Sequence, residues 1–156
     1  MWKASEMSTM CLQHIGATVR EFIADDLDAV MQVECAAFKR PLTERRMIRT
    51  LCRIGTESLV LQRGSAVLGY LTYEVREQYL FINRIAVSCP LCGFGKMLVS
   101  DVQRRCITSG SKWVDVLVDE RDLNSQKFFS RVRFKAIDIV KGNSDQYLFR
   151  HLRGDR

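Results

Sequence analysis

The stretch from Arg84 to Val102, RIAVSCPLCGFGKMLVSDV, combines residue types that can do chemistry. An apolar run ends at Val87, and Gly93 to Lys96 spell G-x-G-K at the start of an amphipathic segment. The first amides of a helix lack intrahelical partners, and glycines let those amides approach an anion closely. Lys96 in the first turn is slightly unfavourable for the helix dipole, and a bound anion would explain it. A phosphate-binding turn and an ordinary strand-to-helix turn both fit this motif.

Two better-known nucleotide motifs do not fit the same stretch. The pattern G-x-x-x-x-G-K-[ST] of a P-loop is absent, and the third glycine of a dinucleotide fingerprint is missing. The glycines alone therefore identify no ligand, and the elements around them must decide.

Cys89 and Cys92 form a C-x-x-C within the same stretch. The sequence has no second pair or histidine cluster, since His14 and His151 lie near the two ends, so we expect no metal site. The N-terminal segment does not resemble a secretory signal, and we expect buried free thiols in a reducing cytoplasm. A Cys89–Cys92 disulfide is the alternative, because a cysteine before a helix N-terminus is more reactive. Such a bond would distort the turn. The remaining cysteines are Cys11, Cys35, Cys52 and Cys106.

The 156 residues carry a net charge of +6, which suggests an anionic partner. The basic residues are scattered among acids and are not interleaved with aromatic residues, so we expect no nucleic-acid partner. No apolar run reaches the roughly 18 residues of a membrane span, and we expect no membrane partner. A phosphate-rich cofactor would use the same positive field.

Hydrophobic periodicity predicts an α/β protein with a mixed sheet and helices on both of its faces. The expected order is β-α-α-β-β-β-α-β-α-β-β. We expect a loosely ordered leader over residues 1–17, a single domain over 18–152 and a tail over 153–156. The helices are expected after Asp25, over 43–54, after Gly95 and over 123–132; the strands near 18–22 and over 58–64, 66–75, 77–87, 113–120, 134–140 and 146–152.

This order resembles the GCN5-related N-acetyltransferase (GNAT) family over nearly all of residues 18–152. The segment INRIAVSCPLCGFGKMLV looks like the acetyl-CoA motif of that family, in which an I-A-V strand leads to R/Q-x-x-G-x-G/A and a helix. VDVLVDERDLNSQKFFSRVRFKAIDI resembles the second family signature. The FFSRVRF segment and Asp145, Tyr147 and Leu148 are most similar to the RimI-like protein N-terminal acetyltransferases.

The resemblance implies that acetyl-CoA lies between splayed strands as the cosubstrate. It implies an amine-bearing acceptor, and first among these a protein N-terminal α-amine, with a small-molecule amine or a lysine side chain as alternative acceptors. A non-catalytic module that binds acyl-CoA is the alternative function. A backbone amide near Val87 would polarise the thioester carbonyl. The residues implied in cofactor binding are Ile85, Ala86 and Val87 along the pantetheine, Leu91, Cys92, Gly93, Phe94, Gly95 and Lys96 at the pyrophosphate, and Asn124 and Phe128 near the thiol.

The sequence departs from the family pattern at the proton-transfer positions. Phe129 stands where the family has a tyrosine acid, and Leu117 where RimI-like enzymes have a glutamate base. Arg133 replaces a glycine. Glu120 and Asp119 are the candidate replacement bases, and Tyr147 is the candidate acid, although solvated strand ends and a packed tyrosine explain the same residues. The loop before Gly93 is also short and has lost the usual arginine or glutamine, which leaves Lys96 or Arg84 to supply a cation. Further candidates are Glu74 and Glu77 as bases and Asn83 as a residue that orients the substrate.

Overall fold

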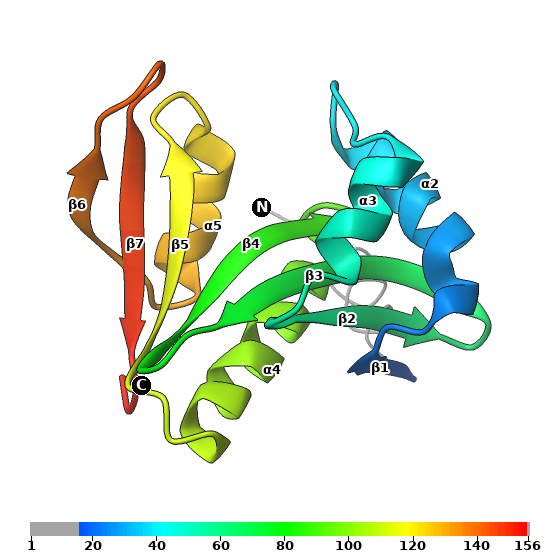
Figure 1. Cartoon of the computed structure of the whole chain (residues 1–156), viewed down its shortest axis with the longest axis horizontal. Coiled ribbons are helices and arrows are strands. Elements are labelled where there is room, and N and C mark those ends of the chain that lie inside the picture. Colours follow the sequence, from blue (N-terminus) through cyan, green and yellow to red (C-terminus); the bar gives the residue numbers. More distant parts are fainter. Residues whose placement is uncertain (1–15, 156) are drawn as a thin grey trace, which may run out of the picture.

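The computed structural model describes residues 16–155, and its elements follow the predicted order with one extra 3-10 turn (Figure 1). The leader expected over residues 1–17, with Cys11 and His14, lies almost entirely outside the described residues. The elements are β1 (Ala17–Glu21), η1 (Ala24–Asp26), α2 (Leu27–Ala37), α3 (Glu44–Leu51), β2 (Thr56–Arg63), β3 (Ala66–Val75), β4 (Tyr79–Val87), α4 (Phe94–Thr108), β5 (Trp113–Asp119), α5 (Leu123–Arg131), β6 (Lys135–Val140) and β7 (Gln146–Leu152).

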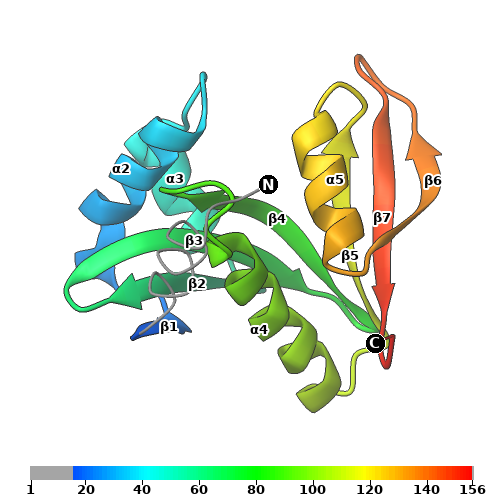
Figure 2. The same cartoon turned by 180° about the vertical axis from the view of Figure 1, so that it is seen from behind.

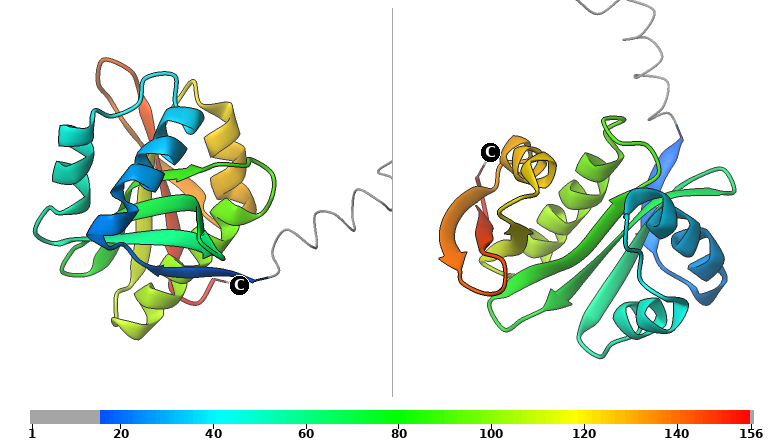
Figure 3. Two further views of the ribbon diagram at one scale, coloured as in Figure 1. Left: turned by 90° about the vertical axis from the view of Figure 1, so that its right-hand side faces the viewer. Right: turned by 90° about the horizontal axis from the view of Figure 1, so that it is seen from above.

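The seven strands form one mixed sheet in the order β1-β2-β3-β4-β5-β7-β6. Every neighbouring pair is antiparallel except β4 and β5, which are parallel because the α4 crossover joins them. Helices α2 and α3 cover one face of the sheet, and α4 and α5 cover the other (Figures 2 and 3). The predicted mixed α/β fold is confirmed.

Each face of the sheet has its own apolar core, as the alternation of strand side chains requires. Leu59 and Leu61 of β2 join the larger core beneath α4 and α5, whereas Val60 between them joins the smaller core beneath α2 and α3. From α3, Met47 and Leu51 are buried in the smaller core. The remaining face of α3 is therefore left to solvent.

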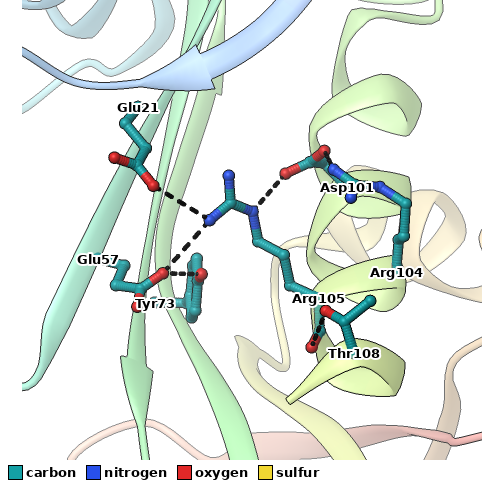
Figure 4. Close-up of polar contacts among 7 residues, drawn as sticks. All are labelled: Glu21, Glu57, Tyr73, Asp101, Arg104, Arg105 and Thr108. Atoms are coloured by element: carbon teal, nitrogen blue, oxygen red, sulfur yellow. Dashed lines mark hydrogen bonds and ion pairs between the residues drawn. The ribbon is translucent and has the colours of Figure 1, made fainter.

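A charged cluster on α4 ties this helix to the edge of the sheet (Figure 4). The Arg105 guanidinium donates to Asp101 at 2.6 Å and to Glu57 of β2 at 3.4 Å, and lies 3.6 Å from Glu21 of β1. Tyr73 donates its hydroxyl to the same Glu57 carboxylate. Burial and this hydrogen bond raise the pKa of Tyr73 above its usual range, so the tyrosine remains a donor. The cluster adds polar contacts between the sheet and the C-terminal half of α4, whose N-terminus carries the glycine motif.

The expectation of buried free thiols is only partly correct. Cys106 is a buried free thiol, but Cys35 and Cys52 are exposed. Cys35 lies on the surface of α2 and Cys52 at the C-terminal end of α3, and neither belongs to an apolar core. Among residues 16–155, no three histidine, cysteine or acidic side chains are grouped to hold a metal ion. Within the same range, no helix is long and apolar enough to cross a membrane.

Candidate active site

Strands β4 and β5 separate part of the way along their length. Their pairing runs from Tyr79 opposite Trp113 to Ile82 opposite Val116 and then stops, although both strands continue. We call the two ends that no longer pair with each other, Asn83–Val87 and Leu117–Asp119, the fork. The two strands diverge toward their C-terminal ends in Figures 1 and 2. Backbone groups of Asn83–Val87 that point toward β5 thus have no strand partner there and are free for a ligand.

A β-bulge at Asn83 marks the start of the fork. Tyr73 lies opposite Ile82 and Thr72 opposite Arg84, so Asn83 has no counterpart on β3. The extra residue resets the alternation of side chains along the strand. Arg84 consequently points to the α2 face, whereas Ile85 and Val87 pack on the α4 core.

The segment Leu91–Lys96, which we call the glycine turn, leads from β4 into α4. Gly93 is the N-cap and adopts a left-handed conformation with φ of 79°. Because a glycine cap has no side chain, no cap hydrogen bond occupies the amides of the first turn. Lys96 is exposed and forms no ion pair within residues 16–155. The side chains of Cys92 and Phe94 are buried, so these two residues present only backbone to a ligand at the turn.

A disulfide joins Cys89 to Cys92 across the start of the glycine turn. The expectation of free thiols at these two positions is therefore wrong. The bond encloses Pro90 and Leu91, and Leu91 has a positive φ of 63° and a largely exposed side chain. The loop that the disulfide closes thus contains a leucine in a conformation that this residue seldom adopts.

Helix α5 packs directly on the glycine turn. A Cβ at Gly95 would lie 3.0 Å from the Phe128 ring, so α4 and α5 approach closely only because residue 95 is a glycine. Asp122 caps α5 by accepting a hydrogen bond from the Ser125 amide at 3.0 Å. Asn124 is exposed in the first turn of α5. Of the two predicted thiol-end residues, Phe128 thus contacts the turn and Asn124 lies at the surface.

Asp119 ends β5 at the tip of the fork and Glu120 follows it in the next turn, and their surroundings differ. Asp119 accepts hydrogen bonds from Arg121 at 3.1 Å and from Ser144 at 2.7 Å. The hydrogen bonds from Arg121 and Ser144 hold the pKa of Asp119 well below its usual range, which makes it a weak base. The Glu120 carboxylate is exposed and accepts no hydrogen bond from the described residues. Glu120 is the better placed of the two to accept a proton.

Of the other candidate groups, Tyr147 borders the fork, whereas Glu74 and Glu77 lie at the opposite end of β4. Tyr147 lies opposite Val118 on β7, one strand beyond β5, and packs partly buried against the larger core. Glu74 is the residue before the last of β3 and pairs with Arg53 and Arg76, near the paired end of β4. Glu77 follows in the same β3–β4 connection.

At the two positions that depart from the family pattern, the structure places apolar side chains. Phe129 is buried, with its ring centroid 5.3 Å from that of Phe134 and 6.5 Å from that of Phe149. Leu117, in the fork, lies opposite Leu148. Neither side chain can transfer a proton.

Comparison with solved structures identifies the fold. The Escherichia coli ribosomal-protein-S18-alanine N-acetyltransferase superposes with a TM-score of 0.79 at 15% identity, over 90% of this chain and 96% of that one. Arabidopsis thaliana NAA60, bound to a bisubstrate analogue, gives 0.71 at 15% identity over 87% and 97%. The Thermoplasma acidophilum PaiA N-acetyltransferase, in complex with coenzyme A, gives 0.75 at 13% identity over 87% and 98%. The chain has the GNAT fold. No protein-family model matches the sequence, and no curated protein matches it.

Sequence reasoning missed one part of this GNAT fold, a buried carboxylate beside the fork. Glu34 of α2 is fully buried and accepts hydrogen bonds from Arg84 at 3.1 Å, from the Leu42 amide at 2.7 Å and from the Tyr70 hydroxyl. Burial raises the pKa of Glu34, but the hydrogen bonds from Arg84, Tyr70 and Leu42 outweigh it and leave the pKa lowered. Arg84 thus pairs with Glu34 on the α2 face. It does not supply a cation to the glycine turn, although the sequence pattern predicts it as one of two residues that would. In the sequence, the sign of this buried carboxylate is an acid among the apolar positions of the 27–37 helix.

Proposed function

We propose that this chain is an acetyl-CoA-dependent N-acetyltransferase that acts on a primary amine. The observation that carries the proposal is the fork between β4 and β5, which opens beside a glycine-capped helix N-terminus. Along Ile85, Ala86 and Val87, the backbone groups that point away from β3 and toward β5 offer hydrogen bonds to the amide groups of pantetheine. The first-turn amides of α4 and the Lys96 ammonium offer partners for the pyrophosphate. The residues present therefore fit acetyl-CoA.

The chemistry that we assign to this site is a direct transfer. The acceptor nitrogen attacks the carbonyl carbon of the thioester, the carbon–sulfur bond breaks, and CoA leaves as a thiolate. A backbone amide of β4 near Val87 would stabilise the charge that develops on the carbonyl oxygen. Alignment of the two reactants along the fork supplies most of the rate enhancement, because a bound pair avoids the entropy cost of an encounter.

The amine must lose a proton during the transfer. Glu120 is the group that we assign as the base, directly or through water, because its carboxylate is exposed at the tip of β5 and free of hydrogen bonds from the described residues. Asp119 is the weaker candidate, because Arg121 and Ser144 depress its pKa. With Phe129 at the tyrosine position, the thiolate takes its proton from water or from Tyr147.

For the acceptor we propose a protein N-terminal α-amine in the cytoplasm. The support is the likeness of the fold to an enzyme named for the alanine of ribosomal protein S18 and to NAA60. Release of the CoA thiol with a panel of peptide N-termini, small amines and lysine peptides tests the proposal. Turnover on peptides with a free N-terminus, but not on N-terminally blocked copies, is the expected result. Turnover on small amines or lysine side chains alone would redirect the acceptor assignment.

A second candidate is a GNAT-fold module that binds acyl-CoA without transferring the acyl group. The burial of Phe129 among Phe134 and Phe149, together with Leu117 in the fork, favours it, because both positions lack a proton-transfer group. The same thiol-release assay separates the two candidates. Binding of acetyl-CoA without thiol release on any amine would support the module and overturn the enzyme.

A further inference from the structure

One short segment of the chain has a high density of positive charge. Residues 39–53 contain six of the 24 lysine and arginine residues and only one acid, Glu44. Their net charge of +5 nearly equals the +6 of the whole chain, so the rest of the molecule is close to neutral. Five of these cations, Lys39, Arg40, Arg45, Arg46 and Arg49, form what we call the basic surface.

The cations of the basic surface are exposed and unpaired. In the part of the chain that the structure describes, none of the five forms an ion pair, whereas the sixth, Arg53, pairs with Glu74 at 3.3 Å. Arg45 and Arg49 are four residues apart on α3, where like charges repel. Arg45 also lies in the first turn, where a cation opposes the helix dipole. No acid pairs with these cations to offset the unfavourable interactions. A bound anionic partner would offset them.

The basic surface begins at the fork. Phe38 lies under the Arg84 guanidinium, 4.0 Å from it, and the Leu42 amide donates to Glu34 at 2.7 Å. Lys39 and Arg40 lie between these two anchors, and Arg84 belongs to the unpaired end of β4. The α2–α3 loop and the diverging ends of β4 and β5 lie on the same side of the molecule in Figure 1. A chain whose end lay in the fork can therefore pass close to this loop and reach α3.

We propose that the basic surface binds an acidic segment of the acceptor protein, a few residues beyond the acetylated amine. This inference rests on the proposed function and adds the substrate class to it. The planar guanidinium group of arginine can bind a carboxylate through two parallel hydrogen bonds. Exposed Ile48 and Ile54 adjoin the cations and offer apolar contact to a peptide. Residues 39–53 contain no aromatic residue on which a base could stack, which favours a peptide over a nucleic acid.

The test compares three peptides with the same first residues, followed by an acidic, a neutral or a basic stretch. We expect kcat/KM to be about tenfold higher for the acidic than for the neutral peptide at low salt, and the advantage to shrink at high salt. Arg45→Glu/Arg49→Glu should bring the acidic-to-neutral ratio close to one. The matched control Arg131→Glu/Lys135→Glu reverses two exposed charges on α5 and β6 and should keep the ratio.

Fluorescence anisotropy measures binding of the same peptides without turnover. It therefore tests the docking of an acidic segment separately from acetyl transfer. Charge-dependent binding that Arg45→Glu/Arg49→Glu abolishes, without thiol release, would overturn the enzyme but retain the acidic docking. Thiol release with equal kcat/KM on all three peptides would overturn the docking and retain the enzyme. Tighter binding of a single-stranded RNA than of the acidic peptide, lost in the same variant, would assign the surface to nucleic acid instead.

Discussion

Gly93 is the residue on which the cofactor site depends most. Its left-handed conformation positions the first-turn amides of α4, and a carboxylate there would repel the pyrophosphate. We expect acetyl-CoA near 100 times its Kd to raise the Tm of the wild type by roughly 5–10 °C, and Gly93→Glu to remove most of this shift.

The matched control for this change is Gly110→Glu. Gly110 also has a positive φ, of 77°, but it lies beyond the far end of α4 with open space around it. It incurs the same backbone strain without touching the glycine turn. A shift that survives in Gly93→Glu, or disappears equally in Gly110→Glu, would show that the turn is not the pyrophosphate site. Differential scanning fluorimetry measures both.

Glu34 is the residue whose loss should destabilise the protein most. Glu34→Gln leaves Arg84 half-buried without its counter-charge, and such a break costs about 3–5 kcal/mol. The folded-state pKa of Glu34 lies below its ordinary value of 4.5, so its contribution to stability is fully present above that pH. The contribution is lost as the pH falls through the lowered pKa.

Urea denaturation at several pH values tests this account of Glu34. The free-energy difference between wild type and Glu34→Gln should be constant above about pH 5 and should shrink as the pH drops below 4.5. The exposed Glu44→Gln on the neighbouring helix should change stability by less than about 0.5 kcal/mol. A difference that is independent of pH across this range would contradict an ionised Glu34.

The disulfide between Cys89 and Cys92 adjoins the glycine turn, so we expect the turn to depend on the redox state. Because the bond constrains Leu91 beside the amides that face the cofactor, we expect reduction to relax the loop and to tighten acetyl-CoA binding. Titration calorimetry with and without a dithiol reductant measures the change. Cys89→Ser/Cys92→Ser should bind like the reduced wild type in both conditions, while Cys35→Ser should respond to reductant as the wild type does. Equal affinities before and after reduction would leave the bond with a structural role alone.

At the scale of elements, the contact between α4 and α5 shapes the site. Gly95→Ala would place a Cβ 3.0 Å from the Phe128 ring and should cost about 1–3 kcal/mol through overpacking. In a Phe128→Ala background the same change should be neutral or stabilising by about 0.5–1 kcal/mol, because alanine favours a helix over glycine. A double-mutant cycle by chemical denaturation gives the coupling. Additive effects would show that the two helices are not in contact here.

The elements themselves were predictable because their patterns are local. Alternation and helical spacing predict each strand and helix in the correct order, and Gly64-Ser65 predicts the hairpin between β2 and β3. The direction of Arg84 was not predictable in this way. It depends on the bulge at Asn83, which moves Arg84 to the α2 face, and the bulge arises from the pairing of two strands. The buried Glu34 shows in the sequence only as an acid among apolar positions, without its partners.

At the scale of the whole molecule, we propose that the two faces of the sheet have different functions, cofactor binding and acceptor binding. The α4–α5 face presents the glycine turn, and the α2–α3 face presents the basic surface, with the fork between them (Figure 3). The net charge of the sequence predicts an anionic partner, and the basic residues are spread along the chain, but residues 39–53 alone have a net charge of +5. Only the folded chain relates this segment to the fork, through Phe38 and Leu42.

A crystal structure of the protein grown with acetyl-CoA tests the central claim most directly. The account predicts difference electron density for the pantetheine arm along Ile85–Val87, between β4 and β5, with the pyrophosphate at the first-turn amides of α4. Density for acetyl-CoA elsewhere on the molecule, or an empty fork at saturating acetyl-CoA, would contradict it.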